Sequence, residues 1–119
     1  MDATTGALLN TVSGITNHGG GGPTLNGSVV YITNNGALEA RNAGDLSLLW
    51  SFAGDGAHRW SSVVASGHVY VSSDANLYAV KLTTHAQVAT AAGGGWLQVA
   101  EGKLFASGRD GIVRAFRLQ

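Results

Sequence analysis

The stretch Ser66–Val80 reads SGHVYVSSDANLYAV, and it decides the fold. Its apolar residues form two short runs with a polar turn between them, which is the pattern of a β-hairpin. The first run does not alternate, because Val69, Tyr70 and Val71 are consecutive. A strand with one wet face would alternate apolar and polar residues. We therefore predict a hairpin that has neighbours on both of its faces.

Two further copies of this hairpin lie in the chain. Val29–Ala40 (VVYITNNGALEA) and Lys103–Ala115 (KLFASGRDGIVRA) match His68–Ala79 (HVYVSSDANLYA) in their apolar, turn and small residues. The copies follow one another at a period of about 39 and then about 36 residues. Periods in this range are typical of propeller blades. The Asn35-Gly36 and Asp110-Gly111 pairs supply the positive φ angles that tight hairpin turns need.

Each copy extends into a unit of four antiparallel strands. No segment carries helical periodicity, so no helix is expected. The strands are predicted at Thr24–Asn26, Val29–Thr33, Ala37–Asn42 and Leu46–Phe52; at Ser61–Ala65, Val69–Ser73, Leu77–Leu82 and Ala86–Ala91; and at Leu97–Ala100, Lys103–Ser107 and Ile112–Leu118. The stretch Asp2–Asn10 (DATTGALLN) resembles the fourth element of the other units and predicts a last strand at Ala7–Val12.

The predicted fold class is all-β, a β-propeller segment of three four-stranded antiparallel blades. Residues 1–119 form one domain, with units of about 36–40 residues at 13–52, 53–92 and 93–119 plus 1–12. The N-terminal strand would complete the last blade of its own chain or of a neighbouring one. Propellers have at least four blades, so three cannot close a ring. We predict a homo-oligomer, with a six-bladed dimer favoured; the alternative is a fragment of a longer propeller.

The composition excludes several function classes. Seven basic and seven acidic residues give a net charge of zero, so no nucleic-acid or anionic-membrane partner is expected. The absence of cysteine excludes disulfides, thiolate metal sites and a cysteine nucleophile. No apolar run approaches the roughly 18 residues of a membrane helix, and no signal peptide precedes the first repeat.

The pieces GHVYVSSDANLYAV and DATTGALL resemble the pyrroloquinoline-quinone-type (PQQ-like) propeller repeat. Trp50 stands where that repeat has a tryptophan that docks on the next blade, and Asn10 and Ala89 stand at the equivalent positions. The family includes quinone-dependent dehydrogenases and non-catalytic scaffolds. The resemblance implies an extracytoplasmic location, periplasmic or secreted; the residues themselves leave the compartment unknown.

The sequence carries no recognisable catalytic, cofactor or metal constellation. Asp74 and Asp110 fall in hairpin turns, where aspartate bonds to nearby backbone. No run of acidic residues has calcium-loop spacing, and no histidine pair has zinc-site spacing. The residue types of a catalytic triad occur in Ser61, His58 and Asp55, but no nucleophile-elbow motif surrounds the serine. We expect no enzyme; PQQ and calcium would enter only if the chain were a piece of a dehydrogenase.

One group of residues suggests binding. The stretch Asp55–Trp60 (DGAHRW) leads into one predicted first strand, and Trp96 precedes the next. First strands of a propeller line its central channel, so His58, Arg59, Trp60 and Trp96 are candidates for an aromatic, basic rim. Such a rim could stack a carbohydrate or hold an extended protein segment at the channel mouth. The alternative is that both indole rings plug the channel or pack between blades.

The leading functional prediction is a non-enzymatic PQQ-like module, a scaffold or binding unit that self-assembles into a closed ring. The first alternative is a fragment or remnant of a quinone-dependent dehydrogenase. The second is a designed or reconstructed propeller without a ligand.

Overall fold

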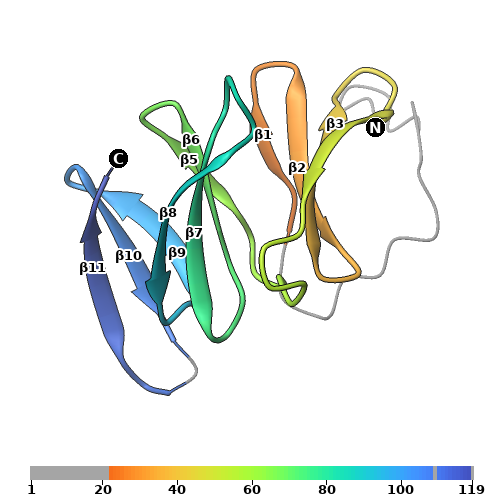
Figure 1. Ribbon diagram of the computed structural model, residues 1–119. Helices are drawn as coiled ribbons and strands as arrows, with labels where there is room; N and C mark the ends of the chain where they lie inside the picture. Colours follow the sequence, from red (N-terminus) through yellow and green to blue (C-terminus); the bar gives the residue numbers. More distant parts are fainter. Residues whose placement is uncertain (1–21, 109, 119) are drawn as a thin grey trace, which may run out of the picture.

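The computed structural model describes residues 22–108 and 110–118, and these form three antiparallel sheets without a helix (Figure 1). Sheet 1 contains β1 (Thr24–Asn26), β2 (Val29–Asn34), β3 (Ala37–Asn42) and β4 (Leu48–Phe52). Sheet 2 contains β5 (Val63–Ala65), β6 (His68–Ser72), β7 (Asn76–Lys81) and β8 (Gln87–Ala92). Sheet 3 contains β9 (Trp96–Ala100), β10 (Lys103–Ser107) and β11 (Val113–Arg117). The predicted all-β class is confirmed.

Neighbouring strands in the sequence are also neighbours in each sheet, as three successive meanders. Most strands begin and end within a residue of the prediction. β4 begins two residues late, at Leu48, because Leu46 has a φ angle of 63° and belongs to the preceding turn. β5 also begins two residues late, at Val63. The strand predicted at Ala7–Val12 lies outside the described residues.

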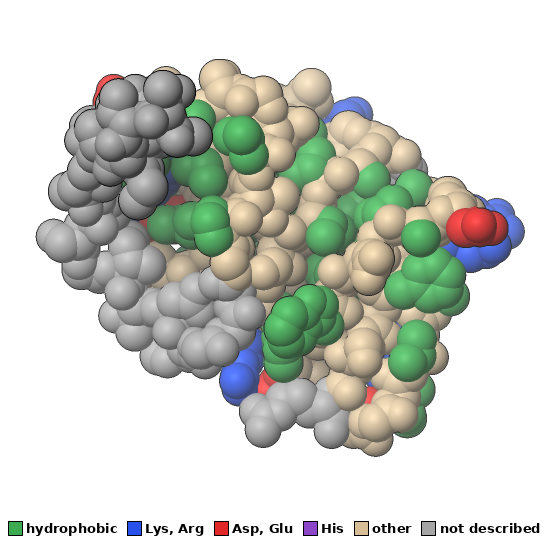
Figure 2. Space-filling model, turned by 180° about the vertical axis from the view of Figure 1, so that it is seen from behind, with side chains coloured by type: hydrophobic (Ala, Val, Ile, Leu, Met, Phe, Trp, Pro, Cys, Tyr) green, Lys and Arg blue, Asp and Glu red, His purple; other side chains and the backbone are tan. Residues whose placement is uncertain are grey.

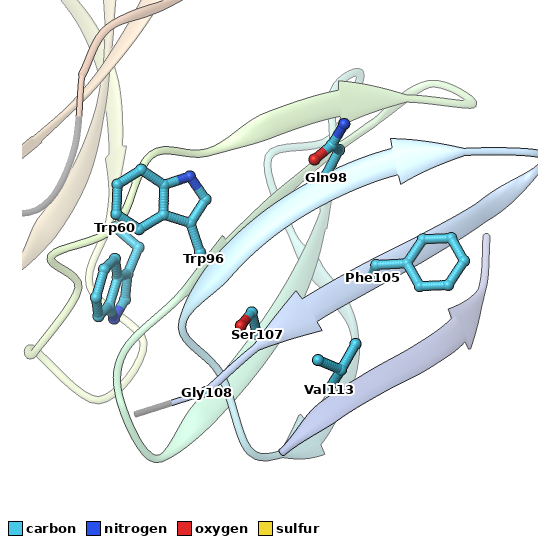
Figure 3. Close-up of a pocket in the computed structure, with 7 residues that line it drawn as sticks. All are labelled: Trp60, Trp96, Gln98, Phe105, Ser107, Gly108 and Val113. Carbon is cyan, nitrogen blue, oxygen red and sulfur yellow. The ribbon is translucent and has the colours of Figure 1, made fainter. Parts of the chain in front are cut away.

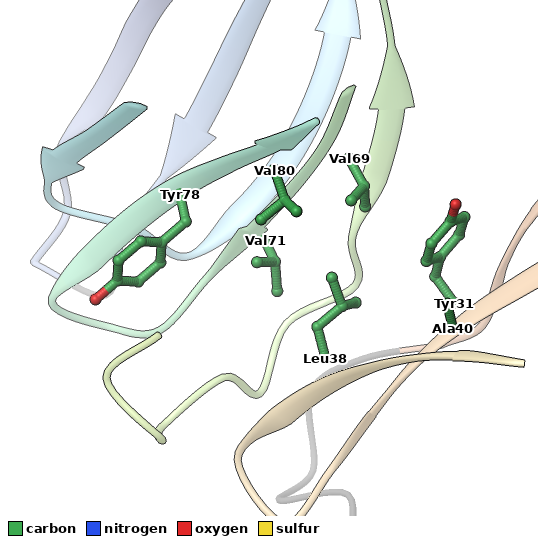
Figure 4. Close-up of a cluster of buried hydrophobic side chains, with 7 residues drawn as sticks. All are labelled: Tyr31, Leu38, Ala40, Val69, Val71, Tyr78 and Val80. Carbon is green, nitrogen blue, oxygen red and sulfur yellow. The ribbon is translucent and has the colours of Figure 1, made fainter. Parts of the chain in front are cut away.

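Sheet 2 lies between the other two and is covered on both faces (Figure 1). One face packs against sheet 1 in a cluster of seven buried residues: Tyr31, Leu38, Ala40, Val69, Val71, Tyr78 and Val80 (Figure 4). The other face packs against sheet 3 in a second cluster: Tyr70, Leu77, Ala79, Leu97, Leu104 and Ala106. Burial on both sides explains why the hairpin of β6 and β7 does not alternate.

Equivalent residues recur on one face of every sheet, which we call the forward face. In sheet 1 and sheet 2 these residues are buried against the next sheet: Tyr31, Leu38 and Ala40, then Tyr70, Leu77 and Ala79. The pairing registers place Phe105, Val113 and Ala115 at the same positions of sheet 3. No described sheet covers this third forward face, and Val113 is 68% exposed.

The connection between β4 and β5 runs along the boundary of sheet 1 and sheet 2. The amide of His58 donates to the carbonyl of Gly36, 2.9 Å away, and so ties the connection to the β2–β3 turn. Gly36 has a φ angle of 86°, and a Cβ there would overlap the carbonyl oxygen of Gly56. The connection can approach this closely because glycine has no side chain.

Within the described ranges, no helix could span a membrane.

Candidate binding site

Two indole rings meet at the edge of the forward face of sheet 3. Here a pocket of about 470 Å³ opens beside β9, β10 and β11. We call it the aromatic pocket; it is lined by Trp60, Trp96, Gln98, Phe105, Ser107, Gly108 and Val113 (Figure 3). The centroids of the Trp60 and Trp96 rings are 5.4 Å apart, with the planes inclined at 50°.

Strand alternation builds most of this pocket. Ser107 pairs with Trp96 on one side and with Val113 on the other, and Phe105 pairs with Gln98. Residues that are paired across antiparallel strands share a face of the sheet. The side chains therefore form two parallel rows on the face that points away from sheet 2. Only Trp60 comes from a different segment, the connection before β5.

Trp60 is held by several contacts and is only 9% exposed. Its Nε1 donates to Oδ1 of Asp74 at 2.9 Å. The Arg59 guanidinium lies 5.1 Å from the centre of the indole ring and 3.5 Å from Oδ2 of Asp74. A partly buried hydrogen bond and a cation over the ring both fix the indole in place. For Trp60, these contacts support the packing alternative.

Trp96 has a different environment, since 60% of its surface is exposed. Its ring touches Trp60 but is otherwise open to the pocket (Figure 3). The structure therefore brings together three of the four predicted rim residues: Arg59, Trp60 and Trp96. Of these, Trp96 offers the largest free surface to a partner.

His58 lies apart from the other candidates, and its placement at an exposed rim was wrong. It is 1% exposed, with its ring centre 5.8 Å from that of Phe52 and 5.3 Å from that of Tyr78. The ring nitrogens lie near the carbonyls of Ala53 and Ser72 without a well-formed hydrogen bond. Burial lowers the pKa of His58, and the negative charge of Asp55 opposes this only in part. The side chain packs between sheet 1 and sheet 2.

Asp55 anchors the connection to sheet 2. Its Oδ2 accepts hydrogen bonds from Ser73 Oγ at 2.6 Å and Asn76 Nδ2 at 2.9 Å, and its Oδ1 accepts one from the Ala57 amide at 3.0 Å. Burial alone would raise the pKa of Asp55, but these hydrogen bonds outweigh it and the pKa is lowered. The carboxylate thus serves the structure of the loop.

The Ser61, His58 and Asp55 set does not form a relay among the described residues. Ser61 Oγ accepts a hydrogen bond from the Gly22 amide at 2.7 Å, and the Asp55 oxygens bond to sheet 2 and to their own loop. No hydrogen bond links the three residues. The described ranges also contain no group of three or more His, Asp or Glu side chains that could hold a metal ion.

The two turn aspartates differ from each other. Asp110 Oδ1 accepts from the Ile112 amide at 3.0 Å, as predicted for a turn residue, and Arg114 donates to Oδ2 at 3.1 Å. The Arg114 hydrogen bond, followed by that of the Ile112 amide, lowers the pKa of Asp110. Asp74 bonds to the side chains of Arg59 and Trp60, in the connection before β5. The sequence offered no signal for this contact, because 14 residues separate Trp60 from Asp74.

Similarity to known proteins is restricted to solved structures. No family model and no curated protein matches the chain. The chain is similar to the crystal structure of the computationally designed Ika8 protein, with a TM-score of 0.63 and 12% identity over 81% of this chain. It spans 32% of the Ika8 chain, about a third of its length. The computationally designed Ika4 protein matches at a TM-score of 0.45 and 12% identity, over 96% of this chain and 99% of that chain. At this identity, the likeness to Ika8 concerns the fold alone.

Proposed function

We propose that the three sheets are consecutive blades of a β-propeller, and that the chain functions by assembling with copies of itself into a closed ring. One observation carries this proposal. The forward positions are buried in sheet 1 and sheet 2. In sheet 3, Val113 and Ala115 are exposed and Phe105 is only half-buried. An apolar face that is equivalent to two buried ones favours burial against a further sheet.

The opposite face of sheet 1 supplies a suitable partner surface. Strand alternation places Leu25 and Leu49 there, and these are 67% and 49% exposed. Glu39 and Arg41 share this face, joined by an ion pair of 2.8 Å. The two side chains are already only 13% and 15% exposed and neutralise each other, so contact with a second copy at this face would bury no isolated charge. Figure 2 shows groups of hydrophobic side chains that reach the surface, as expected for a chain with unfilled contacts.

Sheet 3 lacks the fourth strand that the other sheets have, among the described residues. We propose that Ala7–Val12 supplies this strand beside β11 of a second copy. In sheet 1, ten residues (53–62) connect the fourth strand to the next sheet, and eleven residues (13–23) would do so here. The two connections are similar in length, which favours a neighbouring sheet as the place of this strand. Sheet 1 and sheet 3 of one chain are not neighbours, since sheet 2 separates them (Figure 1).

The aromatic pocket is better explained as a contact surface between copies of the chain than as a ligand site. Phe105 and Val113 line the pocket and also form the forward face of sheet 3. A neighbouring sheet would therefore cover most of the pocket. This supports a self-assembling scaffold in which the aromatic pocket is a contact between copies and not a ligand site. The likeness to the designed Ika8 protein fits the alternative of a designed or reconstructed propeller.

Light scattering on the pure protein tests the assembly. We expect the mass of a dimer, or of another small ring, at micromolar concentration. A well-folded monomer would overturn the proposal. Added PQQ and calcium should cause no spectral change and no dye-linked alcohol oxidation; activity would favour the dehydrogenase alternative.

Cross-linking tests separately whether Ala7–Val12 pairs with β11 of a second copy. The chain has no native cysteine, so any disulfide must form between the introduced cysteines. By analogy with the Ala40–Trp50 and Ala79–Ala89 pairs, Asn10 should lie opposite Ala115. A mixture of Asn10→Cys and Ala115→Cys chains should form a disulfide-linked dimer under oxidation. Thr11→Cys mixed with Ala115→Cys is the control, because its side chain would point to the other face. If the chains form a ring but this cross-link does not appear, the pairing of Ala7–Val12 with β11 of a second copy is wrong, while the proposal of a ring stands.

A further inference from the structure

A groove lies between sheet 2 and sheet 3, away from the aromatic pocket. It has a volume of about 270 Å³, and its walls include Tyr70, Ala79, Ala89, Leu104, Phe116 and Arg117. Both of these walls belong to one chain. Its lining is mainly apolar, and Arg117 is the charged residue of its wall.

The equivalent place between sheet 1 and sheet 2 is occupied by an indole ring. Trp50 pairs with Ala40, which pairs with Tyr31; in sheet 2, Ala89 pairs with Ala79, which pairs with Tyr70. Trp50 and Ala89 therefore hold the same position in equivalent rows of side chains.

The Trp50 ring is held by aromatic contacts. It meets the Tyr31 ring edge-on at 6.0 Å and stacks on the His85 ring of sheet 2 at 4.3 Å, with an interplanar angle of 10°. Both distances fall within the range in which aromatic pairs attract each other. At Ala89 the side chain ends at Cβ, so the corresponding space between sheet 2 and sheet 3 lacks an indole.

We propose that this groove binds a flat aromatic molecule of about the size of indole. Tyr70 can contact the bound aromatic molecule as Tyr31 contacts the Trp50 ring. Leu104 and Phe116 provide an apolar wall from sheet 3. Selection is by shape and stacking, so an aliphatic molecule of similar size binds less well.

Titration of the full chain with indole tests this proposal. Saturation-transfer NMR reports on the bound ligand, and the melting temperature reports on stabilisation. Ala89→Trp should fill the groove, reduce indole binding at least about tenfold and raise the melting temperature. Val88→Trp, on the next residue and the opposite face of β8, should leave binding unchanged. Cyclohexanol replaces indole as the non-aromatic control.

A second variant keeps the test decisive if Ala89→Trp does not fold. Trp50→Ala should open the equivalent space between sheet 1 and sheet 2 and raise the indole stoichiometry from one to two per chain. Two results overturn the proposal: no indole binding to the unmodified chain, or equal binding to the Ala89→Trp and Val88→Trp variants. Unchanged stoichiometry in folded Trp50→Ala would also overturn it, because the equivalence of the two positions would fail.

Discussion

The connection between β4 and β5 places three consecutive side chains in three environments. His58 turns into the boundary between sheet 1 and sheet 2, and Trp60 turns toward Asp74. Arg59, between them, remains partly exposed over the Trp60 ring. These placements depend on Asp74, Tyr78 and the β2–β3 turn, which lie far along the chain. Local sequence could therefore identify the candidate residues but not separate the buried histidine from the exposed indole of Trp96.

The neutral state of His58 should make stability depend on pH. Its pKa in the folded chain lies below the ordinary value of 6.5, so the unfolded chain binds more protons near that pH. Stability is thus fully present above pH 6.5 and falls as the pH drops toward the folded pKa. We expect a lower melting temperature at pH 5.5 than at pH 7.5. His58→Phe should reduce this difference in melting temperature between pH 5.5 and pH 7.5, whereas His85→Gln should retain it. An equal difference in both variants would show that His58 is not the group responsible.

The two indoles should respond differently to truncation. Trp60→Ala removes a largely buried ring and leaves Asp74 without its Nε1 donor, so unfolding free energy should fall by about 3–5 kcal/mol. Trp96→Ala removes a ring that is 60% exposed and should change it by only about 0.5 kcal/mol. Urea denaturation of each chain measures both values. A similar loss in the two variants would mean that Trp96 also has a packing role.

At the scale of the strands, the sequence was most informative where the hairpin repeats. β2, β6 and β10 begin within one residue of their predicted starts, because each follows a tight turn and carries the same apolar run. The connections between sheets were less predictable. Their course depends on single close approaches, such as that of Gly36 to Gly56, which leave no periodic pattern.

Gly36 and Gly67 provide a matched test of that close approach. Both have positive φ angles, 86° and 73°, but a Cβ at Gly67 would meet open space. Gly67→Ala should cost about 1–2 kcal/mol in unfolding free energy, from backbone strain alone. Gly36→Ala adds overlap with the Gly56 carbonyl and should cost about 2–5 kcal/mol. Chemical denaturation compares the two; equal losses would show that the connection moves aside easily.

At the scale of the whole molecule, each sheet presents a forward face to the next one. Two of these faces are covered within the chain, and the third is open at Val113. The repeat in the sequence predicted this order of sheets. It left open how the third face is covered, because a repeat specifies the contact between neighbouring sheets but not which chain supplies the neighbour.

Val113→Glu tests whether a second copy covers this face. The equivalent residues Leu38 and Leu77 are 0% and 5% exposed, so Val113 should become similarly buried in the ring. A carboxylate at this position would lose its hydration without gaining a partner, which costs about 3–5 kcal/mol, or at least about 100-fold in association. Light scattering should show a monomer, while circular dichroism should retain the β-sheet signal. Thr83→Glu, in the β7–β8 turn, places the same charge away from the face and should leave the assembly intact. An unchanged mass for the Val113→Glu variant would mean that the forward face of sheet 3 does not form the contact between copies.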